Sequence, residues 1–98
     1  LPKWERLTEL YCDSWQTKYM LTRWGTCNTE KKKLWFNLQL AQKPIECLEY
    51  VILHELLHLK ERTHNSVFIS CMDLYMKDWR AVRKELNDLR LDYYNKVE

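Results

Sequence analysis

The run H-E-L-L-H at residues 54–58, with another histidine at position 64, constrains this chain more than any other stretch. Side chains four residues apart share one face of a helix, so a helix here would point the imidazoles of His54 and His58 at one place. A catalytic zinc ion takes three protein ligands and keeps one position open for water. His64 is the candidate third ligand, and Glu55 is placed to take a proton from that water as the general base. Since all 3 histidines of the chain fall in this stretch, it predicts a Zn²⁺ site.

An H-E-x-x-H run can also arise by chance, with both histidines as ordinary polar-face residues of an amphipathic helix. The flanking sequence argues against that interpretation, because Pro44 suits a first helical turn and apolar residues surround nearly the whole helix predicted at 44–60. These apolar residues are Ile45, Leu48, Val51, Ile52, Leu53, Leu56, Leu57 and Leu59. Such a helix is buried, and burying two imidazoles and a carboxylate without partners costs several kcal/mol. A bound metal ion with its water would offset that cost.

Three further helices are predicted from apolar residues at helical spacing. They cover residues 2–13, 66–76 and 79–92. Asn65 or Ser66 is placed to cap the second of these helices, and Asp78 is placed to cap the third. The chain has only 1 glycine and 2 prolines, which favours few tight turns and a mainly helical fold.

Two strands are predicted from the alternation of apolar and polar side chains. They cover residues 17–24 and 33–40, and the polar segment 26–32 between them would let them pair as an antiparallel hairpin. The side chains expected on one face of the second strand are Leu34, Phe36, Leu38 and Leu40. Gly25 is expected where the backbone needs a positive φ or comes very close to a neighbouring element.

The length and composition are those of one soluble globular domain. The chain has 98 residues, of which 46% are hydrophobic and 31% charged, and its net charge of +2 does not by itself imply a nucleic-acid partner. No apolar run approaches the roughly 18 residues of a membrane-spanning helix, so no membrane partner is predicted. The cysteines are Cys12, Cys27, Cys47 and Cys71. They form no C-x-x-C pair, which argues against a cysteine-type zinc finger, and we expect reduced thiols and a cytoplasmic location.

Several segments of the chain agree, in order and spacing, with one known family pattern. They are T-R-W-G-T-C at 22–27, L-Q-L at 38–40 and Y-V-I-L-H-E-L-L-H-L at 50–59, followed by His64 and Phe68. Together they resemble the YgjP-like zinc metallopeptidases, which are relatives of the SprT and WLM groups within the zincin superfamily. The resemblance covers roughly residues 15–90. The chain departs from the family pattern at Thr26, where serine is usual, and at Asn65 and Ser66, where serine and proline are usual.

The resemblance implies an α+β fold with a minimal zincin-like core. That core has an N-terminal helix, a small antiparallel β-sheet, the H-E-x-x-H helix and two C-terminal helices. It also implies a single catalytic domain over residues 1–98, with His54, His58 and His64 as zinc ligands and Glu55 as general base. The family's N-terminal β-rich portion is absent from this sequence, so we expect a C-terminal catalytic fragment of a longer protein.

The leading hypothesis is a zinc metallopeptidase that hydrolyses a peptide bond. The sequence does not identify the group that stabilises the developing oxyanion, for which Arg23, Asn37 and Tyr50 are candidates. A sheet this small leaves exposed edges. We therefore expect an extended peptide or protein substrate to pair with the edge of the 33–40 strand.

Two other functions remain open. A metal-dependent nucleoside triphosphate pyrophosphohydrolase would bind a nucleotide and hold its phosphates with Arg23 or the lysines at 31–33, although the chain lacks a phosphate-cradling glycine loop and the extra carboxylates that hold Mg²⁺. A zinc-stabilised binding module without activity would have a closed site with four ligands. The absence of a basic stripe argues against nucleic-acid binding. If His64 were not a ligand, a glutamate of the last helix, such as Glu85, would become the candidate.

Overall fold

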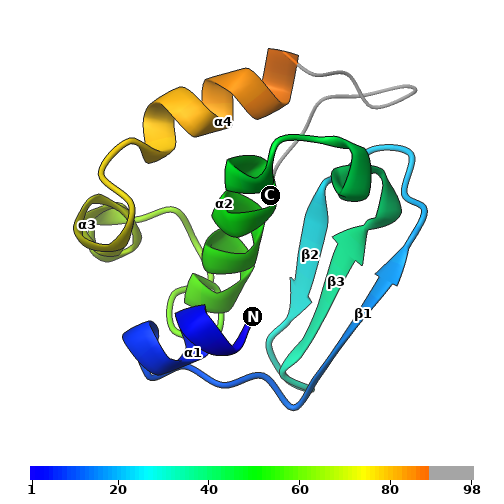
Figure 1. Ribbon diagram of the computed structural model, residues 1–98. Helices are drawn as coiled ribbons and strands as arrows, with labels where there is room; N and C mark the ends of the chain where they lie inside the picture. The colour runs from blue at the N-terminus through cyan, green and yellow to red at the C-terminus, as the bar shows by residue number, and fades with distance from the viewer. Residues whose placement is uncertain (89–98) are drawn as a thin grey trace.

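The helix that carries the H-E-x-x-H run lies in the middle of the structure, a computed structural model that describes residues 1–88. The elements in chain order are α1 (Pro2–Thr8), β1 (Ser14–Lys18), β2 (Gly25–Asn28), β3 (Lys33–Asn37), the 3-10 helix η1 (Leu38–Gln42), α2 (Ile45–Leu57), α3 (Ser66–Tyr75) and α4 (Trp79–Asp88). Figure 1 shows the sheet on one side of α2 and helices α3 and α4 on the other. The predicted α+β class, with a small sheet and a central histidine-bearing helix, is confirmed.

From Tyr50 to Leu57, helix α2 is buried on all sides, as its nearly continuous apolar sequence predicted, whereas Ile45 in its first turn is 67% exposed. Its buried residues are Cys47, Tyr50, Val51, Ile52, Leu53, His54, Glu55, Leu56 and Leu57. Strands β2 and β3, helix α1 and helices α3 and α4 all contact it. The histidines and the glutamate of the motif are therefore held in the core of the fold instead of on a flexible surface segment.

The sheet has the strand order β1-β3-β2, with β1 parallel and β2 antiparallel to β3. The hairpin is formed by β2 and β3, so the predicted strand at 17–24 is largely wrong. Of the predicted loop at 26–32, residues 29–32 form the turn of the hairpin and residues 26–28 belong to β2. The expected pairing of a peptide with the 33–40 strand is also wrong, because β3 is the central strand and both of its edges are already paired. Within the described residues, the outer edge of β2 has no strand partner.

The segment between β1 and β2 is held by a side chain instead of a strand partner. The amide Nδ2 of Asn37 donates hydrogen bonds to the carbonyl oxygens of Met20, at 2.9 Å, and Arg23, at 2.7 Å. Trp24 is fully buried and Met20 is buried, while Tyr19 is half exposed. The alternating pattern at 17–24 therefore reflects an irregular segment anchored to the core, not a strand.

The helix predicted at 2–13 and the strand predicted at 33–40 both extend too far. Helix α1 ends at Thr8 because Glu9 takes a left-handed conformation with φ of 58°. Strand β3 ends at Asn37, whose side-chain oxygen accepts a hydrogen bond from Gln39 N at 2.9 Å and so starts η1. Leu38 is consequently 51% exposed instead of lining the buried face. The predicted end of the last helix, at residue 92, lies outside the described residues.

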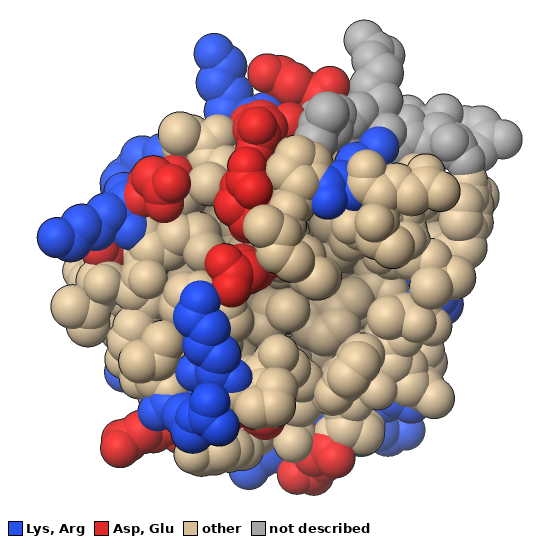
Figure 2. Space-filling model, viewed as in Figure 1, with Lys and Arg blue, Asp and Glu red and all other residues tan. Residues whose placement is uncertain are grey.

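The surface charges, the cysteines and the lengths of the helices add three observations. On the face seen in Figure 2, acidic side chains extend from the top towards the centre, basic side chains continue below them on the left, and uncharged residues cover much of the right-hand half. All four cysteines are free thiols. None of the described helices is long and apolar enough to cross a membrane.

Candidate metal centre

The end of α2 and the loop after it bring the three histidines together. The Nε2 atom of His58 lies 3.3 Å from Nε2 of His54 and 3.2 Å from Nε2 of His64. One nitrogen from each of the three rings lies within 4.8 Å of the others. Tetrahedral zinc with Zn–N bonds of about 2.0–2.1 Å separates its ligand nitrogens by about 3.4 Å. The cluster thus has the spacing that a metal ion requires. It consists of the three histidines that the sequence predicted as metal ligands.

Asn65 fixes the loop that carries His64. Its side-chain oxygen accepts a hydrogen bond from Phe68 N at 2.9 Å and caps α3, as predicted. Its amide donates to the carboxylate of Glu61 at 2.6 Å, on the other side of His64. The Phe68 ring packs against all three imidazoles, with centroid distances of 5.1, 5.0 and 4.9 Å to His54, His58 and His64. The capping residue and one aromatic ring therefore position the third histidine.

The protonation of the histidines suits metal binding. Nδ1 of His58 donates to the backbone oxygen of Glu61 at 3.0 Å, which leaves Nε2 with its lone pair free for a metal. Burial lowers the pKa of His54 to about 2, and burial also lowers the pKa values of His58 and His64. Neutral imidazole is the form that ligates metals. The fold thus keeps these rings ready to bind a cation.

Glu55 has a buried carboxylate with no partner. Its exposed fraction is 0%, and neither carboxylate oxygen has a hydrogen-bond partner among residues 1–88. Burial raises the pKa of this carboxyl group to about 8, although the charge of Arg23 opposes the rise. A buried acceptor without a partner costs about 1–3 kcal/mol, and more when it is charged. A metal ion and its water beside the carboxylate would satisfy it, so the residues present fit a bound metal.

Gly25 lets β2 approach Glu55. A Cβ atom at this position would lie 2.8 Å from Cγ1 of Val51 and 3.1 Å from Cγ of Glu55. Its φ angle is not positive. Of the two roles predicted for this glycine, close approach is confirmed and positive φ is wrong. The absence of a side chain brings the edge strand directly against the face of α2 that carries Glu55.

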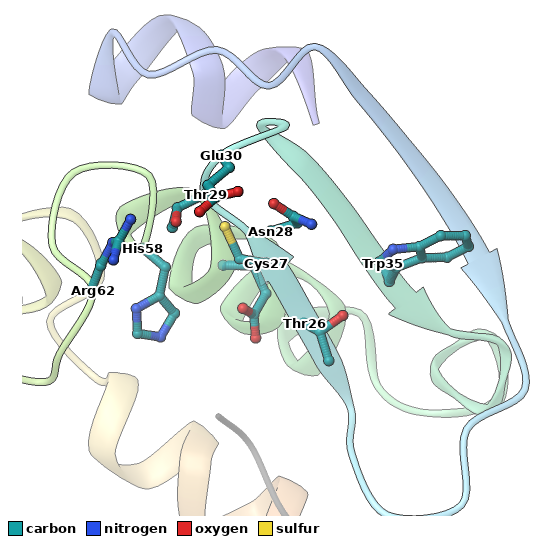
Figure 3. Close-up of a pocket in the computed structure, with 9 residues that line it drawn as sticks. Thr26, Cys27, Asn28, Thr29, Glu30, Trp35, His58 and Arg62 are labelled. Atoms are coloured by element: carbon teal, nitrogen blue, oxygen red, sulfur yellow. The ribbon is translucent and has the colours of Figure 1, made fainter.

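A pocket of about 610 Å³ opens beside Glu55 and His58 and runs along β2 to the hairpin end (Figure 3). The lining residues are Thr26, Cys27, Asn28, Thr29, Glu30, Trp35, Glu55, His58 and Arg62. The sequence did not indicate a role for Arg62 or for the segment 28–30. Their part in the pocket follows from how the hairpin and the loop after α2 pack, which no local spacing in the sequence indicates.

A model of the YgjP-like metallopeptidase domain matches residues 1–89. The chain belongs to the YgjP-like family. No protein of curated function matches it. The family description and the histidine cluster together indicate a metal-dependent hydrolase.

The structure separates the three oxyanion candidates of this YgjP-like domain. Asn37 is committed to the fold, because its amide donates to two backbone carbonyls and its oxygen accepts from Gln39 N. The ring of Tyr50 lies 5.5 Å from that of His54, and burial raises the pKa of its hydroxyl to about 12. Tyr50 therefore stays a protonated donor beside the cluster, and Arg23 acts electrostatically on Glu55.

Glu85, the reserve ligand candidate, does not join the histidines. Its carboxylate oxygen lies 3.6 Å from Sγ of Cys47, near the start of α2. Among the described residues, the group that could hold a metal contains His54, His58 and His64 and no carboxylate.

Proposed function

We propose that this YgjP-like domain is a zinc-dependent peptidase in which His54, His58 and His64 hold the zinc ion and Glu55 is the general base. One observation carries the proposal. The buried carboxylate of Glu55, which has no hydrogen-bond partner among residues 1–88, directly follows His54, whose ring nitrogen lies within 4.8 Å of those of His58 and His64. A structural carboxylate would have hydrogen-bond partners in the fold, so this one is best explained by what binds next to it.

The protein's own groups divide the work as follows. Zinc, when bound, lowers the pKa of a water molecule towards about 7 and polarises a carbonyl group. Glu55 accepts the proton of the attacking water and passes it to the leaving amine. Its burial against Gly25 keeps bulk water away from that proton. Tyr50 is protonated and adjacent to His54, which suits it to donate a hydrogen bond to the oxyanion.

The position of β2 supports a peptide substrate. This strand is at the edge of the sheet and lines the pocket that contains Glu55 and His58. Unpaired backbone groups on an edge strand can form hydrogen bonds with an extended peptide. We infer that the substrate lies along β2, with its scissile bond over the histidines.

Two observations favour this function over the alternatives. The lysines at 31–33 do not line the pocket, and the ammonium group of Lys33 lies 4.3 Å from the centroid of the Trp35 ring, so a phosphate clamp by this run lacks support. The metal-ligand cluster of the described residues has three members, which is the ligand number of a catalytic zinc site and one fewer than that of a closed structural site.

The test combines metal content with turnover. Elemental analysis should find near-stoichiometric zinc in the wild type and in Glu55→Gln, and a large loss in His64→Ala. Casein-like peptides should be cleaved by the wild type and not by Glu55→Gln. The matched control is Glu46→Gln, an exposed glutamate of the same helix, which should cleave at the wild-type rate.

Three results would refute the proposal. Equal zinc in the wild type and His64→Ala would remove His64 from the ligand set. Retained turnover in Glu55→Gln would remove Glu55 as the base. Release of pyrophosphate from nucleoside triphosphates without any peptide cleavage would replace the peptidase assignment.

A further inference from the structure

The outer face of the sheet, which points away from α2, is uncovered within residues 1–88. Leu34 and Phe36 of β3 are buried on the α2 side. Successive side chains of a strand point to opposite faces, so Lys33 and Trp35 point outwards. All five residues of β1 are exposed, and Figure 1 shows α2 on the inner side of the sheet with no described helix beyond the strands. The outer face is therefore a free surface of the described chain.

Trp35 carries two lysine side chains on this outer face. The ammonium group of Lys33, two residues earlier on β3, lies 4.3 Å from the centroid of the Trp35 ring. The ammonium group of Lys18, on β1, lies 4.7 Å from the same centroid. Both distances are within the range of cation–π contacts. Two strands thus bring two positive charges to one aromatic ring, and we call Lys18 and Lys33 the lysine pair.

The lysine pair makes no ion pair within residues 1–88. The carboxylates nearest to it in the sequence belong to Asp13, directly before β1, and to Glu30, in the turn between β2 and β3, and neither pairs with these lysines. The strand register places four further residues on the outer face, and all of them are uncharged: Ser14, Gln16, Thr26 and Asn28. The charge of this face is therefore positive, and its complement is an anion.

Trp35 connects the lysine pair to the candidate metal centre. Its side chain lines the pocket that contains Glu55 and His58, and Figure 3 shows it extending from β3 towards β1. Its partner in the register is Thr26 of β2, which follows Gly25, the residue that lies against Glu55. The lysines themselves lie outside the pocket. An anion bound to them would therefore lie beside the substrate path, close to the scissile bond but not at it.

The spacing of strands shows that a peptide on β2 reaches the lysine pair. Neighbouring strands are about 4.8 Å apart, so a peptide paired with the edge of β2 would run about 10 Å from β3. With bonds of about 1.5 Å, a glutamate side chain extends about 4–5 Å from its Cα atom and a lysine side chain about 6 Å. Together they span that distance. Because side chains alternate between faces, only every second peptide residue points to the outer face.

We propose that Lys18 and Lys33 bind an acidic side chain of the substrate on the outer face of the sheet, so that the preferred peptides carry aspartate or glutamate at an outward-facing position near the scissile bond. This inference rests on the proposed peptidase function and specifies its substrate class. A nucleic acid would also supply anions, but its bases stack on free aromatic faces. Both ammonium groups lie over the ring of Trp35, which favours an acidic peptide.

The test uses fluorescent peptides of one casein-derived sequence with blocked ends. Glutamate, glutamine or lysine is placed at one position at a time on both sides of the scissile bond. Fluorescence anisotropy measures binding to the zinc-loaded Glu55→Gln protein, and cleavage is measured with the wild type. At outward-facing positions, glutamate should give about three- to tenfold tighter binding than glutamine. The positions directly next to them should show no such preference.

Lysine variants in the Glu55→Gln background then assign the preference. Lys18→Gln and Lys33→Gln should each reduce it, and the double variant should remove it, with zinc content and the affinity for the glutamine peptide unchanged. Changing both lysines to glutamate should reverse the preference in favour of the lysine peptide. Lys84→Gln is the matched control, because it removes the same charge from an exposed position on α4, on the other side of α2. It should keep the full preference.

The outcomes separate the inference from the function on which it rests. Glutamate-selective binding that depends on both lysines, without cleavage of any peptide, would support the inference and refute the peptidase. Cleavage with equal affinities for glutamate, glutamine and lysine at every position would overturn the inference alone. It would also be overturned if Lys84→Gln lost as much preference as the lysine-pair variants, or if a single-stranded oligothymidylate bound more tightly than every peptide and depended on both lysines.

Discussion

Asn37 and Glu55 are both buried polar side chains, with exposed fractions of 1% and 0%, and they lie on adjacent layers of one small fold. Asn37 makes three hydrogen bonds, to the carbonyls of Met20 and Arg23 and from Gln39 N. Glu55 makes none within residues 1–88. The polar atoms of Asn37 are all hydrogen-bonded within the fold, so this region needs no ligand. Burying the carboxylate of Glu55 without a partner lowers the stability of the fold, and a bound ligand would remove that cost. Both side chains are buried, so burial does not distinguish the candidate site from the rest of the fold. The difference is that the carboxylate of Glu55 lacks a hydrogen-bond partner among residues 1–88.

The largest expected effect is on catalysis at the incomplete site. Glu55→Gln should lower peptide turnover by about 10²–10⁴-fold, the range that general acid–base groups contribute. Glutamine has nearly the same shape, so the fold and the zinc content should not fall. Steady-state kinetics beside elemental analysis measures both. A comparable loss of turnover in Asn37→Asp with normal zinc would erase the distinction between the two regions.

The complete region should respond in stability instead. Asn37→Ala removes one acceptor and two donor contacts. The carbonyl of Arg23 then lacks this partner, while the carbonyl of Met20 keeps only its hydrogen bond from Gln39 Nε2 at 3.2 Å. We expect the free energy of unfolding to fall by about 3 kcal/mol, measured by urea denaturation. Asn28→Ala is the control, because Asn28 is exposed and its side chain accepts one hydrogen bond, from Lys31 N. A loss below that of the control would mean that Asn37 does not anchor the segment between β1 and β2.

The pH dependence of the metal-free protein tests the incomplete region directly. The pKa of Glu55 is raised from 4.5 to about 8. Between these two pH values the folded state therefore keeps a proton on Glu55 that the unfolded state releases. Stability from this group is therefore present below about pH 4.5 and is lost as the pH rises through 8. Between pH 6.5 and 8 the free energy of unfolding should fall by about 2 kcal/mol.

His54 titrates in the opposite direction. Its pKa is lowered from 6.5 to about 2, so its contribution to stability is present above pH 6.5 and is lost as the pH falls. Urea denaturation in the presence of a chelator should show the fall above pH 6.5 in the wild type and not in Glu55→Gln. A wild-type curve that is flat between pH 6.5 and 8 would contradict a buried, protonated Glu55.

The same contrast explains what the sequence could predict. Helices α2, α3 and α4 follow from apolar residues at helical spacing, and the ligand set follows from short spacings, because both depend on neighbours within about one or two turns. The segment 17–28 was misjudged because its conformation depends on Asn37, which bonds to residues 14 and 17 positions earlier in the chain. The same limit applies to Arg62, which lines the pocket because of how the hairpin and the loop after α2 pack.

The smallest expected effect lies at the contact between the sheet and the site. Gly25→Ala would place a methyl group 2.8 Å from Cγ1 of Val51 and 3.1 Å from Cγ of Glu55. Overpacking of this kind costs about 1–3 kcal/mol, and because the valine side chain is stiff we expect about 1–2 kcal/mol by urea denaturation. Turnover should fall as well, because the same methyl group displaces the carboxylate.

A second substitution separates these two consequences. Val51→Ala removes the closest contact of the new methyl group and leaves its contact with Glu55. In a double-mutant cycle, Gly25→Ala should therefore destabilise the Val51→Ala protein by about 1 kcal/mol less than it destabilises the wild type, while turnover stays low in the double mutant. If turnover recovered together with stability, the glycine would serve packing alone, and the approach of β2 to Glu55 would have no part in aligning the base.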